Sequence, residues 1–238
     1  MQAKLLFVVT PAMALLAACG SSKKATPDAK IVLPVDAAPV TIDAPPACEI
    51  SSPDFGDKGA VTMGGSVYNP GMPANGLPAA PYVGMFAPLT ATATPDAIFV
   101  DFYSGYAPFG TETAPTPLVT GTYQISGDQL NFATCGVCVT AAAKLTQNSN
   151  AGDFMATGGT VDVTMAGNAV GGTLTLKLTN VTFEQVTIDE ATLESTPVGN
   201  NCKTKVGNMT YTGVMEAPAA KPSAPNQRVR VRLTKNRY

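Results

Sequence analysis

The stretch Thr173-Leu174-Thr175-Leu176-Lys177-Leu178-Thr179 alternates polar and apolar side chains without a break. Because successive side chains of a β-strand point to opposite faces, this period of two predicts a strand with one buried face. The leucines would lie on that face, with Thr and Lys toward solvent. Further along the chain the pattern continues in Val181, Phe183, Val186 and Ile188. This part of the chain is therefore predicted to be sheet rather than helix.

A second, fully buried strand is predicted at Ala97-Ile98-Phe99-Val100-Asp101-Phe102-Tyr103. The other predicted strands are residues 61–68, 121–126, 129–134, 137–143, 154–157, 160–165 and 208–216. Turn residues separate them at 126–128, 148–153, 166–168 and 171–172, at the short intervals typical of hairpins. About nine or ten short strands without a clear helical segment predict an all-β fold, either an antiparallel β-sandwich or a related barrel.

The segment 65–95 is rich in Pro and Gly and contains few strong strand formers. We expect it to form long loops across one end of the fold. Loops of this kind carry binding sites in many proteins, and in others they only cover a sheet edge. Both interpretations stay open for this segment.

The N-terminus has the layout of an export signal. A charged start at residues 1–4 precedes an apolar run over 5–16, which has the length of a secretory signal and not of a membrane-spanning helix. Conventional cleavage after Ala18 would place the bulky Leu16 where a small residue is needed. Leu16-Ala17-Ala18-Cys19 instead resembles the lipobox of bacterial lipoproteins. The alternative is a plain secreted protein in which Cys19 follows small residues by chance.

The lipobox resemblance implies cleavage before Cys19, followed by acylation of its thiol and of the new amine. Each buried methylene adds about 0.8 kcal/mol, so two or three acyl chains would hold the protein at a membrane essentially permanently. In such lipoproteins the residue after the cysteine influences sorting. Gly20 at that position, in place of Asp, implies an outer-membrane destination.

Composition predicts four parts of the chain: a signal peptide over 1–18, a lipid-anchored tether over 19–47, a β domain over 48–216, and a Pro-rich linker with a basic tail over 217–238. The tether is rich in Pro and Ala, and residues 20–47 include no aromatic side chain that would seed a core. A polyproline-like tether of this length would reach about 85 Å.

Besides Cys19 the chain contains Cys48, Cys135, Cys138 and Cys202. An even set of cysteines outside the reducing cytosol predicts two disulfides, for which three pairings exist. We favour Cys135 with Cys138 and Cys48 with Cys202, because the second link would close a long loop from the start of the domain to its far end. The alternatives for Cys135 and Cys138 are redox chemistry, which needs a helix N-terminus beside the thiolate, and metal ligation, which needs further ligands.

The absence of His and Trp from the whole chain narrows the possible chemistry. It removes the commonest general base and leaves a Ser or Cys nucleophile without its usual partner. The acids Asp189, Glu190 and Glu194 are compatible with a carboxylate-dependent hydrolase, but acids are also the usual occupants of exposed strand ends.

Two pairs of acids could join a calcium site: Asp54 with Asp57, and Asp153 with Asp162. Neither pair follows a calcium-loop spacing, and both suit ordinary turns. We therefore expect no bound metal and no cofactor.

Charge is divided sharply along the chain. Residues 48–216 hold 5 basic and 14 acidic side chains, net −9, whereas 217–238 hold 6 basic and none acidic, net +6. In an extended tail the arginines would share one face and the apolar residues the other. Such a row suits polyanions such as lipopolysaccharide phosphates. The candidate polyanion-binding residues are Arg228, Arg230, Arg232, Lys235 and Arg237.

The alternatives for the tail are a protected sheet edge and a frayed terminus. Nucleic acid is a poor partner for it, because the aromatic residues that stack on single strands are missing from the tail's arginine row.

Phe55-Gly56-Asp57, residues 97–103, Gly121-Thr122-Tyr123, residues 131–139 and residues 197–202 together resemble uncharacterised lipoproteins that are abundant in myxobacteria. The resemblance covers most of the body. It implies the same fold and the same cellular address, and it implies no catalytic residue.

The sequence thus predicts a non-enzymatic, lipid-anchored β domain of the cell envelope with a structural or interaction role. Its expected partners are the membrane, through the lipid, and an envelope protein, glycan or lipopolysaccharide. A second hypothesis is a glycan- or polyanion-binding domain that uses the end loops and the Arg-rich tail. The third is a carboxylate-dependent hydrolase.

Overall fold

The structure is a computed structural model that describes residues 47–71, 81–146 and 149–218. Its strands are β1 (Gly59–Val61), β2 (Gly65–Asn69), β3 (Tyr82–Pro88), β4 (Ala97–Tyr103), β5 (Gly110–Thr111), β6 (Ala114–Pro115), β7 (Gly121–Gln124), β8 (Val137–Ala143), β9 (Gly152–Ala166), β10 (Thr173–Ile188), β11 (Ser195–Pro197) and β12 (Lys203–Glu216). One 3-10 turn, η1 (Gly127–Leu130), lies between β7 and β8, and the described residues contain no α-helix. The predicted all-β fold is confirmed.

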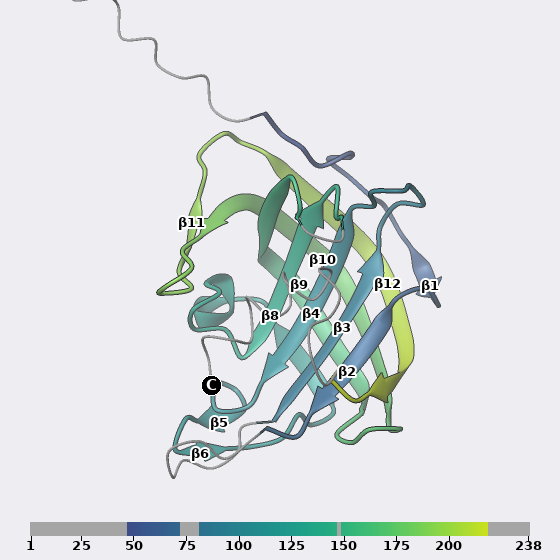
Figure 1. Cartoon of the computed structure of the whole chain (residues 1–238), viewed down its shortest axis with the longest axis vertical. Coiled ribbons are helices and arrows are strands. Elements are labelled where there is room, and N and C mark those ends of the chain that lie inside the picture. The colour runs from purple at the N-terminus through teal and green to yellow at the C-terminus, as the bar shows by residue number, and fades with distance from the viewer. Residues whose placement is uncertain (1–46, 72–80, 147–148, 219–238) are drawn as a thin grey trace, which may run out of the picture. The chain divides into compact units, whose positions relative to one another are not determined.

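Apart from the small β5–β6 hairpin, the strands form one sheet in the order β1-β12-β2-β3-β4-β8-β9-β10-β11, with β7 beside β9. Strand β12 also pairs with β10, so the sheet folds back on itself in a sandwich-like arrangement (Figure 1). The contact between β12 and β2 covers only two residue pairs, Met215 with Ser66 and Glu216 with Val67. A continuous ladder therefore does not close the sheet into a barrel at this point.

The sheet is mixed, whereas the sequence predicted an antiparallel one. Strands β1 and β2 run parallel to β12, and every other described pairing is antiparallel. Antiparallel neighbours can be joined by a short hairpin, but β12 meets β1 and β2 only after the chain has crossed the whole domain. No turn sequence therefore signals the direction of this pairing.

The alternating stretch Thr173–Thr179 is the first half of β10, which pairs with β9 on one side and β12 on the other. Leu174, Leu176 and Leu178 are fully buried, as the alternation predicts, and complete burial of such a side chain contributes about 1.5–3 kcal/mol. After Leu178 the inward positions become odd-numbered, at Val181 and Phe183.

A bulge causes this change of phase. The β9–β10 register shifts between Thr179 and Thr182, where Asn180 takes a φ of 50°, a left-handed conformation that Asn tolerates. On the facing strand Gly159 has a φ of 114°, and a Cβ there would collide with the backbone of Val181. The two strands predicted at 154–157 and 160–165 are therefore one bulged strand, β9.

The main core lies on the inner side of the folded sheet. Alternate residues of β3, β4, β8, β9, β10 and β12 point into it, and Phe109, Leu118, Ile125 and Cys202 from the connecting segments join them. Ring contacts between Phe102, Phe109 and Tyr123 anchor the connection after β4 to this core, with centroids 5.3 to 6.4 Å apart.

Strands β4 and β8 are buried on both faces, since every residue of each is buried. Their outer face carries a second cluster, formed by Tyr82, Tyr103, Phe132, Cys135, Cys138, Met155, Val186 and Leu193. Phe132 and Cys135 belong to the segment between β7 and β8, so this segment covers the outer face of the sheet. Because both faces of β4 and β8 are buried, their sequences are continuous apolar runs and do not alternate with polar residues.

Two local predictions are wrong. Residues 82–88 of the predicted loop segment 65–95 are the sheet strand β3, and residues 65–69 are β2, which overlaps the strand predicted at 61–68. Ring contacts and neighbouring strands stabilise them despite their Gly and Pro content, as in the stacked pair of Phe86 and Phe99. The predicted strand 129–134 is instead the end of η1 and a turn, because Gly127 with its φ of 57° bends the chain there.

Candidate functional site

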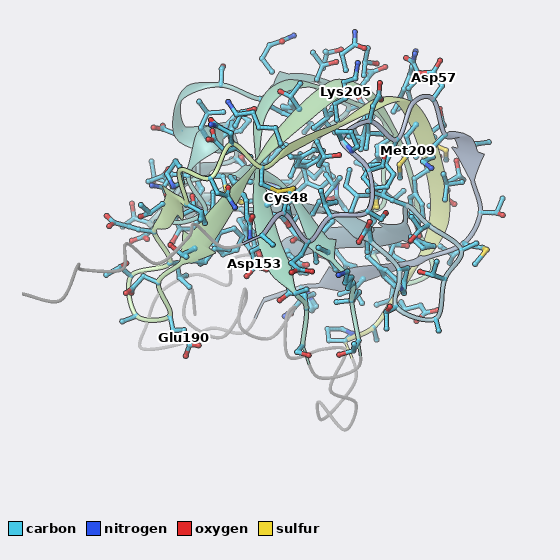
Figure 2. The ribbon with its side chains drawn as sticks, turned by 90° about the horizontal axis from the view of Figure 1, so that it is seen from above. Cys48, Asp57, Asp153, Glu190, Lys205 and Met209 are labelled. Carbon is cyan, nitrogen blue, oxygen red and sulfur yellow. A yellow bond between two sulfur atoms is a disulfide. The ribbon has the colours of Figure 1, made fainter. Side chains whose placement is uncertain are left out.

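In the structure, the cysteines that lie within disulfide distance of one another form the two predicted pairs. Cys48 is bonded to Cys202, and Cys135 to Cys138, each with a Cα–Cα separation of 5.2 Å. The first bond links positions 154 residues apart and joins the first residue of the predicted domain to the start of β12. Figure 2 shows it beside the label of Cys48.

The second disulfide lies in the covered outer face of the sheet and is completely buried at both cysteines. Cys138 is in strand β8, and its cross-strand partner is Asp101 of β4. Neither cysteine stands at the N-terminus of an α-helix, and no sulfur is exposed to a thiol in solution. This environment favours a structural bond that fastens the segment before β8 to the sheet.

A buried Tyr–Asp pair lies next to this disulfide. The Tyr82 hydroxyl donates to Asp101 Oδ1 at 2.5 Å, and both residues are buried. The Tyr82 ring crosses Gly84, where any Cβ would overlap the hydroxyl, so the contact requires glycine at that position. The Tyr103 ring is tilted against that of Tyr82, with the centroids 5.1 Å apart, and it meets the Phe132 ring edge-on.

A second buried carboxylate, Asp96, holds the start of the domain. It accepts hydrogen bonds from the Ser51 N–H at 2.9 Å, from the Ser51 hydroxyl, and from the Lys144 N–H at 2.8 Å. Next to it the Lys144 ammonium donates to Glu49 at 2.5 Å, and this bond raises the pKa of Lys144 above its usual value. These contacts hold the residues after Cys48 against the loops that precede β4 and follow β8.

No motif or spacing in the sequence marks Asp96 or Asp101 as important. The signal that could have found them is their position, since each acid stands within or beside the apolar run of β4. An acid buried in such a run needs hydrogen-bond partners. Their partners come from distant strands and loops, and no local pattern names them.

The acids of the two candidate calcium pairs bind to turns and to neighbouring strands. Asp54 accepts from the Gly56 N–H at 2.8 Å and faces the Lys205 ammonium at 3.0 Å, and these contacts lower its pKa. Asp57 accepts from the Asn208 N–H at 2.7 Å. Over the described residues no three His, Cys, Asp or Glu side chains are placed to share a metal ion.

The second calcium pair is similar. Asp153 accepts from the Asn150 amide at 2.5 Å, and Asp162 accepts from the Thr122 hydroxyl at 3.0 Å on the neighbouring strand β7. The labelled acids Asp57, Asp153 and Glu190 lie at separate places on the domain (Figure 2). They do not converge on one cleft in that view.

The acids of the hydrolase hypothesis lie in the exposed connection between β10 and β11. Asp189 Oδ1 accepts from the Thr192 N–H at 2.7 Å, from the Ala191 N–H at 2.9 Å and from the Thr192 hydroxyl. These bonds lower the pKa of Asp189, which keeps the carboxylate charged as the anchor of its own turn. Glu190 and Glu194 follow it in the same connection and are exposed.

An open groove of about 270 Å³ lies between the end of β1 with the two residues after it and the end of β3 with the three residues after it. Its lining residues are Ala60, Val61, Thr62, Met63, Pro88, Leu89, Thr90 and Ala91, none of them charged. At its margin the Lys58 ammonium donates to the Leu89 carbonyl at 2.8 Å and stands over the Phe55 ring.

The other predicted site residues, Cys19 and the tail residues Arg228, Arg230, Arg232, Lys235 and Arg237, lie outside the described residues. The part of the chain that the structure describes contains no helix long and apolar enough to cross a membrane.

No protein-family model, no curated protein and no solved structure matches this chain. The resemblances to the lipobox and to the myxobacterial lipoproteins therefore stay predictions from the sequence.

Proposed function

We propose that this chain is a lipid-anchored β domain of the bacterial cell envelope with a structural or interaction role and no catalytic one. The observation that carries the proposal is the Cys48–Cys202 disulfide. It stands at the point where the predicted tether meets the sheet. Bonds of this kind form outside the reducing cytosol, which agrees with the export signal and the lipobox-like sequence.

The position of this disulfide suits a domain that is held by its N-terminus. Cys202 directly precedes β12, whose ladder with β10 extends from Thr173 to Glu184 on the β10 side. A pull on the tether would act through the sulfur bridge on this ladder. Residues 49–64, which contain only the three-residue strand β1, would not be peeled away.

The chemistry of the described acids supports a role without catalysis. Asp54 and Asp189 have lowered pKa values because backbone amides of their own turns bind them. Asp96 and Asp101 accept hydrogen bonds inside the domain, from Ser51 and from Tyr82. A general acid needs a raised pKa and access to substrate. These four carboxylates are better suited to stabilising turns and buried contacts.

The proposal is tested by expressing the full chain in a Gram-negative host and analysing the mature N-terminus by mass spectrometry. We expect a chain that begins at Cys19 and carries a diacylglyceryl thioether and an N-acyl group, recovered in the outer-membrane fraction. The matched control is Cys19→Ala, which should keep its leader and lose the lipid mass. A wild-type chain with an unmodified N-terminus elsewhere would contradict the proposal.

A further inference from the structure

The outer surface of the folded sheet is covered in one part and open in another. Over β4 and β8 it is covered by the cluster that includes Tyr103 and Phe132. Over β7, β9, β10 and β12 the outward side chains are exposed or half-buried, so no described residue covers them. Figure 1 shows β9, β10 and β12 side by side in this part of the sheet. An antiparallel sheet can leave such a face to water, so its side chains decide whether it suits a partner.

The strand register places a row of side chains on this open part. Residues directly opposite each other in paired strands point to the same face of the sheet. The partners of Lys177 in β10 are Thr210 of β12 and Asp162 of β9. Thr210 is also the partner of Ala60 in β1, and Asp162 is the partner of Thr122 in β7. The row therefore crosses five strands on one face.

Two further rows lie on one side of the first and carry apolar side chains. Thr175, two residues before Lys177 in β10, pairs with Thr212 of β12 and Met165 of β9. Thr173 pairs with Val214 of β12. Met165 is 50% exposed and Val214 is 60% exposed. These two apolar side chains thus share the face of Lys177.

A fourth row lies on the other side. Thr179 pairs with Asn208 of β12 and Thr160 of β9, and Thr160 pairs with Gln124 of β7. We call the four rows together the open face. It is defined by Thr173, Thr175, Lys177 and Thr179 of β10, with the β9 and β12 residues paired to them and the β7 and β1 residues paired to those.

The open face is neutral, because Lys177 and Asp162 are its one basic and its one acidic side chain. Residues 48–216 carry 5 basic and 14 acidic side chains, so 4 and 13 of them lie elsewhere, together with the whole net charge of −9. Asp57 and Glu216 stand just outside the face, beside Asn208 and Val214. Two copies of such an acidic body repel each other in most orientations, and the open face is where they can approach with less repulsion.

The two charges of the open face are arranged for a contact between copies. The Lys177 ammonium makes no ion pair or hydrogen bond within the described residues, and Asp162 accepts from the Thr122 hydroxyl at 3.0 Å. A two-fold axis that runs along the strands between β9 and β10 places Lys177 of each copy over the partner's Asp162. The charge pattern is therefore self-complementary, as a two-fold symmetric contact requires.

The size of the open face suits a weak contact. Four strands spaced about 4.8 Å apart and a length of about 24 Å for Thr173–Thr179 give about 460 Å² per copy, or about 900 Å² for two copies. Interfaces that bury less than about 1,200 Å² in total are typical of weak, transient associations.

We propose that the open face is a homodimer contact, in which two copies of this chain pack sheet to sheet and Lys177 of each pairs with the partner's Asp162. Met165 and Val214 lose exposed apolar area in the same contact, which adds to its stability. The inference goes beyond the proposed function and does not depend on acylation of Cys19. Copies anchored to one membrane would meet at a high effective concentration, which favours a contact that is weak in solution.

The test is sedimentation equilibrium of the mature chain, residues 19–238, with Cys19→Ser so that no lipid is attached. We expect a monomer at about 1 μM and a reversible dimer that is populated at about 500 μM. Lys177→Glu and Asp162→Lys, each alone, bring like charges together across the contact and should weaken association about tenfold or more. The double variant restores opposite charges and should return the dissociation constant to within about threefold of the parent value.

The matched control is Glu194→Lys, which changes the net charge as Asp162→Lys does. Glu194 is exposed in the connection between β10 and β11, outside the open face, so this variant should associate like the parent. Urea unfolding midpoints verify that each variant is folded.

A parent chain that stays monomeric at the highest concentration would overturn the inference. So would single variants that associate like the parent, or a double variant that associates no better than the single ones, because Lys177 would then not face the partner's Asp162. An unacylated Cys19 in the wild-type chain would overturn the proposed function but leave this inference intact.

Discussion

Removal of the Cys48–Cys202 disulfide by Cys48→Ala and Cys202→Ala tests how the domain is stabilised. The bond closes a loop with a sequence separation of 154, for which the chain-entropy relation gives about 5 kcal/mol of stabilisation. Cys135 and Cys138 are only 3 apart, and the same relation gives less than about 2 kcal/mol for their bond. Since domains of this size are stable by about 5–15 kcal/mol, losing the long-range bond should remove a large share of the total.

The assay is equilibrium urea unfolding of the mature chain carrying Cys19→Ser, with Cys135→Ala plus Cys138→Ala as the matched control. Freeing a large loop expands the unfolded state, so the m-value should rise in the Cys48–Cys202 variant and stay unchanged in the control. The control should still be destabilised, because both of its cysteines are buried and their loss leaves a cavity. An unchanged m-value in the first variant would refute the reasoning.

Three further predictions follow from single contacts. Gly84→Ala places a methyl group against the Tyr82 hydroxyl and should lower the free energy of unfolding in urea by about 2–3 kcal/mol. The control is Gly158→Ala, where the nearest atom to the new methyl group is 3.4 Å away, and it should cost less than about 1 kcal/mol. Equal costs would contradict the steric argument. Asp96→Ala removes the acceptor of three hydrogen bonds and should lower the free energy of unfolding by about 3 kcal/mol, and Asp96→Asn should lower it by less. If Asp96→Ala unfolded at the same urea concentration as wild type, these bonds would contribute nothing to stability. The pKa of Asp189 is lowered in the folded state, so its carboxylate stabilises the fold above the unfolded-state pKa, and this stabilisation is lost as the pH falls through the folded-state pKa. The difference in the free energy of unfolding between wild type and Asp189→Ala should therefore shrink below about pH 4 in urea titrations. A constant difference would contradict this.

The fold could be predicted wherever a strand repeats a local pattern. Strands β4 and β8 begin and end at the predicted residues 97–103 and 137–143, because burial on both faces makes each an unbroken apolar run. In the first half of β10 only one face is buried, so the leucines alternate with polar residues as predicted. The pattern was insufficient for β3, since its stability comes from neighbours such as the Phe86–Phe99 ring pair and not from its own Gly- and Pro-containing sequence.

The candidate site was predictable only where covalent chemistry limits the choices. Four body cysteines allow three pairings, and loop length favoured the one observed. The hydrogen bond between Tyr82 and Asp101 was not predictable, because its two residues come from different strands and meet only through the β3–β4 register, over a glycine.

By itself the amino-acid sequence determined the all-β class, the even set of body cysteines, the division of charge between body and tail, and the candidate anchor at Cys19. Each of these depends on composition or on neighbours along the chain, whose physical effect is local. Only the tertiary structure decided the parallel attachment of β1 and β2 to β12 and the burial of Asp96 and Asp101. These features arise from the register between strands distant in sequence, and register is set by the packing of the whole core.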